Sequence, residues 1–105
     1  MFQDLPKVIT VSGGEENKIY YDSPTLGSSA PFTINTGITL SDLQGEHYAI
    51  CISSPAFYGA IGFIKDGAII DKKEYYGSIS VQNDEIVFTI STGGAANKPC
   101  YVWVI

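Results

Sequence analysis

The sequence predicts an all-β protein, an antiparallel two-sheet β-sandwich that is jelly-roll-like and has about eight strands. Three observations support this fold class. Short segments of alternating apolar and polar residues recur along the chain, turn-forming residues separate them at short intervals, and no segment has a helical period over a useful length. A small β-barrel is the alternative that the same pattern leaves open.

The strands are predicted from runs of β-branched and aromatic residues with a two-residue period. In chain order they cover residues 6–12, 17–22, 32–35, 46–53, 57–65, 68–71, 74–82, 85–91 and 98–105. The first two are expected to pair as a hairpin around the polar turn 13–16. Ile38–Leu40 is a short apolar piece, and 41–45 is the one predicted helical turn, with Ser41 or Asp42 as its cap.

Turn residues predict how the later strands connect. Asp66-Gly67 is the strongest hairpin signal of the chain, and Asn83-Asp84 is a second turn. Segment 85–91 alternates inward and outward residues, which is typical of an antiparallel meander with one half-solvated face. The glycines in segment 57–65 indicate a bend or a close contact with another backbone.

The same alternation predicts the hydrophobic core. Segment 46–53 has bulky residues on one face and small residues on the other, and we expect its isoleucines to point inward. The expected core consists of Val8, Ile19, Phe32, Ile34, Leu40, Ile50, Ile52, Ile61, Phe63, Ile79, Val81, Ile86, Phe88, Ile90, Val102 and Val104.

The length and composition indicate a single folded domain. A chain of 105 residues has room for one hydrophobic core, which we expect within residues 6–105. Residues 1–5 are expected to form an N-terminal arm that is too short to fold alone. The chain is 45% hydrophobic and 16% charged, which separates it from disordered proteins.

Charge and hydropathy argue against several classes of partner. The net charge of −5, with only six basic residues, does not suit binding to nucleic acid, which requires clustered Lys and Arg. No apolar run approaches the roughly 20 residues of a membrane-spanning helix, so we expect no membrane insertion. The first residues lack the basic and apolar regions of a secretory signal. We therefore expect synthesis in the cytoplasm, and exit only as part of an assembly.

Few residues are candidates for catalysis or metal binding. Cys51 and Cys100 are far apart in sequence, so a zinc site built on closely spaced pairs is excluded. We expect two buried thiols, with an inter-strand disulfide as the alternative. His47 is the only histidine, no Gly-x-Ser-x-Gly motif accompanies it, and turns account for most of the carboxylates. We expect no enzymatic activity, no cofactor and no metal.

The last strand predicts an interface. Val102 and Val104 are assigned to the core, which leaves Tyr101, Trp103 and Ile105 on the opposite face. Aromatic side chains of this kind are enriched where proteins meet. Three other tyrosines, Tyr58, Tyr75 and Tyr76, are candidates for stacking on sugar rings, because each ring combines an apolar face with a polar edge.

The end of the chain also shows a resemblance. The meander from Tyr75 to Ser91, the Gly/Ala/Asn loop after it and the aromatic strand Tyr101–Ile105 resemble the C-terminal part of small β-sandwich modules in bacteriophage virions. Such modules form tail-fibre tips, baseplate parts and head-decoration or head-fibre proteins. The resemblance covers roughly the last third of the chain and assigns no functional residue.

This resemblance implies a non-enzymatic structural or adhesion subunit of a virion. Such a subunit would form homo-oligomers, with trimers favoured, and would dock on other virion proteins. Two other functions are compatible with the residues: a carbohydrate-binding module that holds a cell-surface glycan, and an inhibitor that binds a host protein. Oligomeric state, glycan binding and capture of a host protein would distinguish the three.

Overall fold

The computed structural model describes residues 7–10, 18–54 and 56–105, with side chains described from Tyr20 onward. Within these residues the chain forms nine strands and two 3-10 helices, which confirms the all-β prediction. The elements are β1 (Lys7–Thr10), β2 (Lys18–Asp22), β3 (Phe32–Thr39), η1 (Leu40–Asp42), β4 (Glu46–Ser53), β5 (Gly59–Lys65), β6 (Ala68–Tyr75), β7 (Gly77–Gln82), β8 (Glu85–Ile90), η2 (Gly93–Ala95) and β9 (Cys100–Val104).

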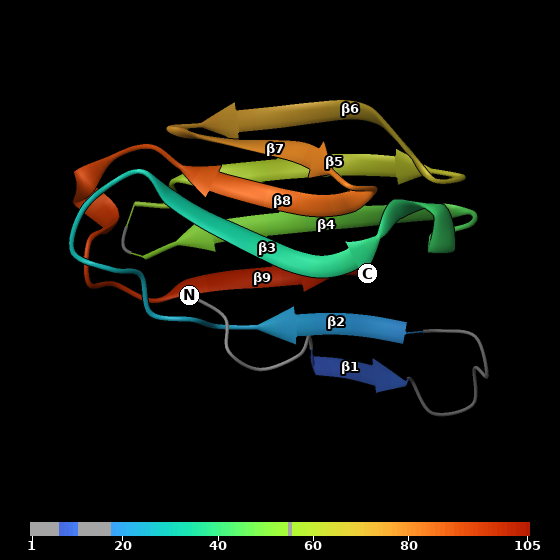
Figure 1. Ribbon diagram of the computed structural model, residues 1–105, viewed down its shortest axis with the longest axis horizontal. Helices are drawn as coiled ribbons and strands as arrows, with labels where there is room; N and C mark the ends of the chain where they lie inside the picture. Colours follow the sequence, from blue (N-terminus) through green and yellow to red (C-terminus); the bar gives the residue numbers. More distant parts are fainter. Residues whose placement is uncertain (1–6, 11–17, 55) are drawn as a thin grey trace.

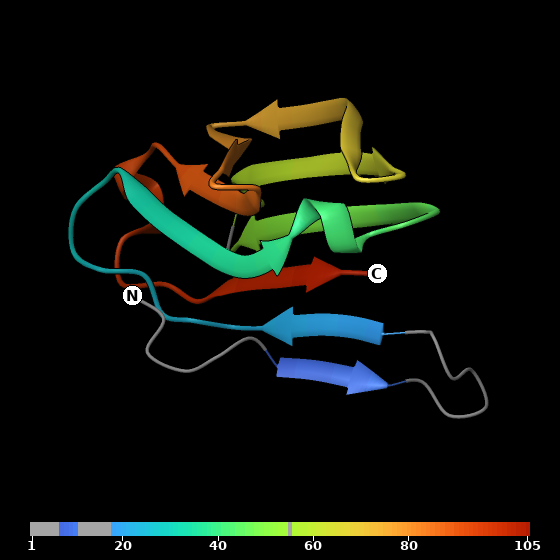
Figure 2. The ribbon, with the colours of Figure 1, turned by 45° about the vertical axis from the view of Figure 1, so that its right-hand side comes forward.

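The strands form two antiparallel sheets packed face to face. The large sheet has the order β1-β2-β9-β4-β5-β6 and the small sheet the order β3-β8-β7. Figures 1 and 2 show the small sheet lying over the middle of the large one, with β1 and β2 extending beyond it. Because no strand pairing joins the two sheets in the described residues, the fold is a sandwich and not a closed barrel.

The last strand is inserted into the middle of the large sheet. The chain leaves β6 for the small sheet, forms β7 and β8 there, and returns as β9 between β2 and β4. The spatial order β9-β4-β5-β6 is that of a Greek key, in which a fourth strand returns beside the first. The apolar final segment therefore has neighbours on both sides.

Both predicted turns join the strands as expected. Asp66 and Gly67, with φ angles of 49° and 80°, connect β5 to β6. Asn83 and Asp84, with φ angles of 52° and 65°, connect β7 to β8. Two consecutive left-handed residues are characteristic of a type I′ turn, whose twist matches that of antiparallel strands.

The predicted strand 74–82 is wrong, because it is divided between the two sheets. Strand β6 continues to Tyr75, Tyr76 adopts a left-handed φ of 50°, and β7 begins at Gly77 in the small sheet. The sequence alternation does not reveal this break, since strand-forming residues stand on both sides of it. As a result, both Tyr75 and Tyr76 are exposed.

The helical turn differs from its prediction in position and capping. It is the 3-10 helix η1 over Leu40–Asp42, and its N-cap residue is Thr39, which makes no side-chain capping bond. Instead, the Ser41 hydroxyl donates to the Asp84 carboxylate over 2.7 Å. The predicted arm 1–5 and turn 13–16 lie outside the described residues.

The small sheet supplies most of the bulk of the core. Phe88, Ile86 and Ile90 of β8 are fully buried. They face a large sheet whose inner residues on β4 and β5 are mostly small: Ala49, Cys51, Ser53, Ala60 and Gly62. A Cβ atom on Gly62 would lie only 2.6 Å from Cδ1 of Ile79, so the small residues make room for the large ones.

The predicted core is therefore wrong at five positions. Ile50, Ile52 and Phe63 are only half-buried and Ile61 is exposed, because β4 and β5 turn their bulky face away from the small sheet. Val81 of β7 is exposed as well. The other expected core residues are buried, apart from two whose side chains lie outside the description, Val8 and Ile19.

The two sheets are in close backbone contact at two glycines, Gly77 of β7 and Gly59 of β5. A Cβ atom on Gly77 would lie 2.8 Å from the Cα atom and 2.9 Å from the carbonyl oxygen of Gly59. Contacts this short leave no room for any side chain. This confirms the close backbone contact that the glycines of segment 57–65 predict.

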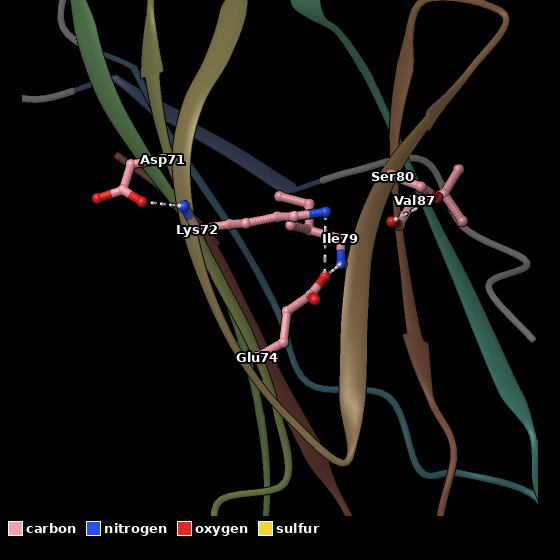
Figure 3. Close-up of polar contacts among 6 residues, drawn as sticks. All are labelled: Asp71, Lys72, Glu74, Ile79, Ser80 and Val87. Carbon is pink, nitrogen blue, oxygen red and sulfur yellow. Dashed lines mark hydrogen bonds and ion pairs between the residues drawn. The ribbon is translucent and has the colours of Figure 1, made fainter.

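A carboxylate covers part of the open edge of β7. Glu74 of β6 accepts a hydrogen bond from the Ile79 amide over 3.1 Å, and its Oε2 atom lies 3.6 Å from the ammonium of Lys72 (Figure 3). Unpaired edge amides invite pairing with other chains. Glu74 therefore satisfies one such donor from within the molecule.

Candidate interaction surface

The outer side of the large sheet is apolar and aromatic across four adjacent strands. None of its nine side chains is fully buried: Tyr21, Tyr48, Ile50, Ile52, Ile61, Phe63, Tyr101, Trp103 and Ile105. We call this set the outer aromatic face. Tyr48 is 50% exposed, Ile105 45% and Ile61 38%.

Strand register arranges these side chains in continuous rows. Tyr21 of β2 lies opposite Trp103 of β9, Trp103 lies opposite Ile50 of β4, and Ile50 lies opposite Ile61 of β5. Directly opposite residues have Cβ atoms about 5 Å apart, so adjacent members of the row can touch. The row crosses four strands without a charged residue.

Contacts between neighbouring aromatic rings fix the side chains of the outer aromatic face. The ring centroids of Tyr21 and Trp103 are 5.8 Å apart, and those of Trp103 and Tyr101 are 6.2 Å apart. On the neighbouring row, the rings of Tyr48 and Phe63 stack with centroids 5.2 Å apart. These distances are typical of aromatic pairs that stabilise each other. The surface is therefore ordered before any partner arrives.

Charged residues of both signs flank this face. Glu46 and Lys65 lie opposite each other at one end of β4 and β5. On β6, Asp71 lies opposite Phe63 and Lys73 lies opposite Ile61. Beside β4, β5 and β6 the rim thus carries two acids and two bases, and on the other side Lys7 of β1 lies opposite Tyr21, although the whole chain has a net charge of −5.

The predicted interface residues belong to this face. Tyr101, Trp103 and Ile105 lie on it, with Ile105 tied to β4 by two backbone hydrogen bonds to Tyr48 of 2.8 and 2.9 Å. Sequence reasoning missed the contributions of β2, β4 and β5. A signal existed: segments 46–53 and 85–91 both have a bulky face, and the space between two sheets cannot hold both.

The three tyrosines predicted to stack on sugars come together at one end of the sandwich. Tyr75 stacks on Tyr58 with centroids 5.7 Å apart and planes 18° apart, and Tyr76 meets both rings edge-on at 4.8 and 5.5 Å. The β4–β5 connection, the β6–β7 turn and η2 share this end (Figure 1). Tyr58 is half-buried, whereas Tyr75 and Tyr76 are 56% and 58% exposed.

The cysteines are buried free thiols whose Sγ atoms lie 3.4 Å apart. The hydrogen bond with Cys100 and the burial of the thiol raise the pKa of Cys51 far above its ordinary value. Because the thiolate is the nucleophilic form, Cys51 is poorly suited to nucleophilic catalysis.

His47 also lacks a catalytic arrangement among the described residues. Its Nε2 atom lies 2.7 Å from the carbonyl oxygen of Gln44, three residues earlier in the chain. No group of three or more His, Cys, Asp or Glu residues in the described part of the chain could hold a metal ion.

Comparison with known proteins yields no relatives: no family model, curated protein or solved structure matches the chain. Among the described residues, no helix has the length and apolar character needed to cross a membrane.

Proposed function

We propose that the chain is a non-enzymatic assembly subunit that associates with further copies of itself through the outer aromatic face. The observation that carries this proposal is the orientation of β4 and β5, which point small residues at the core and bulky ones at the surface. Apolar side chains on a surface stabilise a protein only when a partner covers them and removes them from water.

The size of the face suits the centre of a protein interface. Three inter-strand spacings of about 4.8 Å and four residues of about 3.3 Å span roughly 200 Å² between backbone atoms. Side-chain width raises this to several hundred Å². A standard interface buries about 800 Å² on each partner, with an apolar centre and a polar rim.

A second copy of the chain is the occupant that the charges favour. Copies with a net charge of −5 repel each other over most of their surface. The rim of the outer aromatic face carries charges of both signs and no excess of acids, so two copies can meet there without the repulsion of the rest of the surface. The face is also formed by one continuous sheet, which suits sheet-on-sheet packing.

The resemblance of the last third of the chain to virion modules supports a more specific proposal. In it, the assembly is part of a bacteriophage virion, the number of copies is three, and the oligomer docks on other virion proteins. The copy number and the particle rest on that resemblance, whereas the surface rests on the arrangement of the side chains.

Light scattering coupled to size-exclusion chromatography tests the surface with a matched pair of variants. Ile61→Lys places a charge on the outer aromatic face, and Val81→Lys places one at an equally exposed position of the small sheet. Burying an unpaired ammonium costs several kcal/mol. We expect an oligomer for the natural chain and for Val81→Lys, and a monomer for Ile61→Lys.

Circular dichroism confirms that each variant is folded. A natural chain that is monomeric at micromolar concentration would overturn the proposal, and so would equal dissociation of the two variants. If the chain forms a dimer and not a trimer, the proposed interface stands and the expected number of copies is wrong.

A further inference from the structure

A depression of about 220 Å³ lies at the margin of the outer aromatic face, where Ile61 of that face meets Tyr75 of the three clustered tyrosines. Phe57 from the β4–β5 connection and Tyr75 from β6 line it, together with Gly59 and Ile61 of β5 and Lys73 of β6. Gly59 of β5 lies opposite Tyr75 of β6 and has no side chain. The surface of the sheet is therefore open beside the Tyr75 ring.

Two aromatic residues at the end of the sandwich where the three tyrosines cluster have a backbone conformation that bulky residues rarely adopt. Phe57 has a φ of 61° and Tyr76 a φ of 50°. Each such conformation costs of the order of 1–3 kcal/mol. Burial does not offset that cost, because the two side chains are 72% and 58% exposed. Strain of this kind concentrates at ligand sites, where it presents a side chain to a partner.

The Tyr75 ring is held in place before a ligand binds. Tyr58 stacks on it, Tyr76 meets it edge-on at 4.8 Å, and Tyr58 itself packs against the η2 loop, where a Cβ atom on Gly94 would lie 3.1 Å from its ring. A preorganised aromatic surface loses little conformational entropy when a ligand stacks on it. Its hydroxyl group adds a hydrogen-bond donor and acceptor at the edge.

Two charged residues line the depression: Glu74, whose carboxylate accepts a hydrogen bond from the Ile79 amide, and Lys73. Lys73 forms no ion pair with any other described residue, in contrast to Lys72, whose ammonium lies 3.6 Å from Glu74. An unpaired cation at the margin of an apolar surface, on an otherwise acidic chain, is complementary to an anionic group of a ligand.

We propose that this depression binds a pyranose ring that carries a carboxylate, such as a uronic acid or a sialic acid at the end of a glycan. The apolar face of the sugar stacks on Tyr75 and contacts Phe57, its carboxylate is bound by the ammonium of Lys73, and its hydroxyl groups bond the tyrosine hydroxyls. This site adjoins the outer aromatic face and shares Ile61 with it, but its proposed ligand contacts are made by Tyr75, Phe57 and Lys73.

Saturation-transfer NMR tests the site directly, because irradiation of the aromatic protons reaches a sugar stacked on them. The probes are 3′-sialyllactose, trigalacturonic acid and, as the neutral reference, lactose. We expect at least one acidic probe to bind about tenfold more tightly than lactose, and added salt to weaken that binding. Sialyllactose and trigalacturonate distinguish the two sources of the carboxylate.

Three variants and one control assign the contacts. Tyr75→Leu should weaken binding about tenfold, whereas Tyr75→Phe should retain most of it because the ring remains. Lys73→Gln should remove the preference for the acidic probe, and Lys65→Gln, at the other end of β5, should leave binding unchanged.

Failure of both acidic probes to bind would overturn this proposal, as would binding that Tyr75→Leu and Lys73→Gln leave intact. Light scattering on the same samples reports self-association separately, so loss of one property does not imply loss of the other.

Discussion

The buried hydroxyl of Tyr20 couples the stability of the fold to pH. Tyr20 is only 3% exposed, and burial, assisted by the charge of Asp22, raises the pKa of its hydroxyl well above the ordinary value of 10.0. The folded protein therefore holds this proton more tightly than the unfolded chain does. The stabilising contribution is complete below pH 10 and is lost as the pH rises above it.

We expect the free energy of unfolding to fall above pH 10 by up to about 1.4 kcal/mol per pH unit through Tyr20. Urea denaturation of the natural chain and of Tyr20→Phe, between about pH 7 and about pH 12, measures this contribution as a difference in slope. The raised pKa of Cys51 also lowers stability at high pH, but it does so in both proteins and cancels in the difference between their slopes. Equal slopes would show that the hydroxyl titrates alike in both states.

Strands β7 and β5 of the two sheets are in backbone contact because Gly77 has no side chain. The Cβ atom that alanine would add meets backbone atoms of Gly59 and the carbonyl oxygen of Thr89, all within 2.9 Å. Backbone atoms cannot rotate away as the end of a side chain can. Strand β7 would have to move away from β5 to relieve the contact.

We expect Gly77→Ala to lower the free energy of unfolding by about 1–3 kcal/mol or more, the usual cost of overpacking. Gly27→Ala is the control, because nothing lies within 4 Å of the added atom. It should be neutral or slightly stabilising, since alanine restricts the unfolded chain. Chemical denaturation compares the two variants. A small change for Gly77→Ala would mean that the sheets can separate there at little cost.

At the scale of elements, local residue chemistry predicted the turns well and the sheet membership poorly. Asp66-Gly67 and Asn83-Asp84 adopt left-handed conformations largely through their own side chains and neighbours, so their positions can be read from sequence. The break at Tyr76 cannot, because Gly77 beside it stands alone as a turn signal and the two-residue alternation continues on both sides. The break exists because β7 pairs with β8 in the small sheet, whereas β6 pairs with β5 in the large sheet. Such pairing joins different segments of the chain, so the local sequence does not reveal it.

For the whole molecule, the proposed self-association predicts that thermal stability depends on protein concentration, because binding between folded copies stabilises the folded state. We expect the Tm of the natural chain to rise between about 5 µM and about 100 µM, and the Tm of Ile61→Lys to stay constant. Differential scanning fluorimetry across this range checks both. A constant Tm for the natural chain would contradict association through the outer aromatic face.

The sequence by itself determined the class of the protein and most of its strands. Two-residue alternation, turn residues and the absence of helical periods are local properties, and they predicted an antiparallel two-sheet sandwich. The alternation of side chains along the last strand also assigned Val102 and Val104 to the core and left Tyr101 and Trp103 on the outer face.

Only the tertiary structure decided which face of β4 and β5 points inward. A strand with one bulky and one small face can be oriented either way, and the choice depends on the volume that the opposite sheet supplies. Here Phe88 and its neighbours fill that volume, so Ile50 and Ile61 turn outward and join Trp103. The candidate surface is thus a consequence of packing between residues far apart in the chain, which local pattern cannot encode.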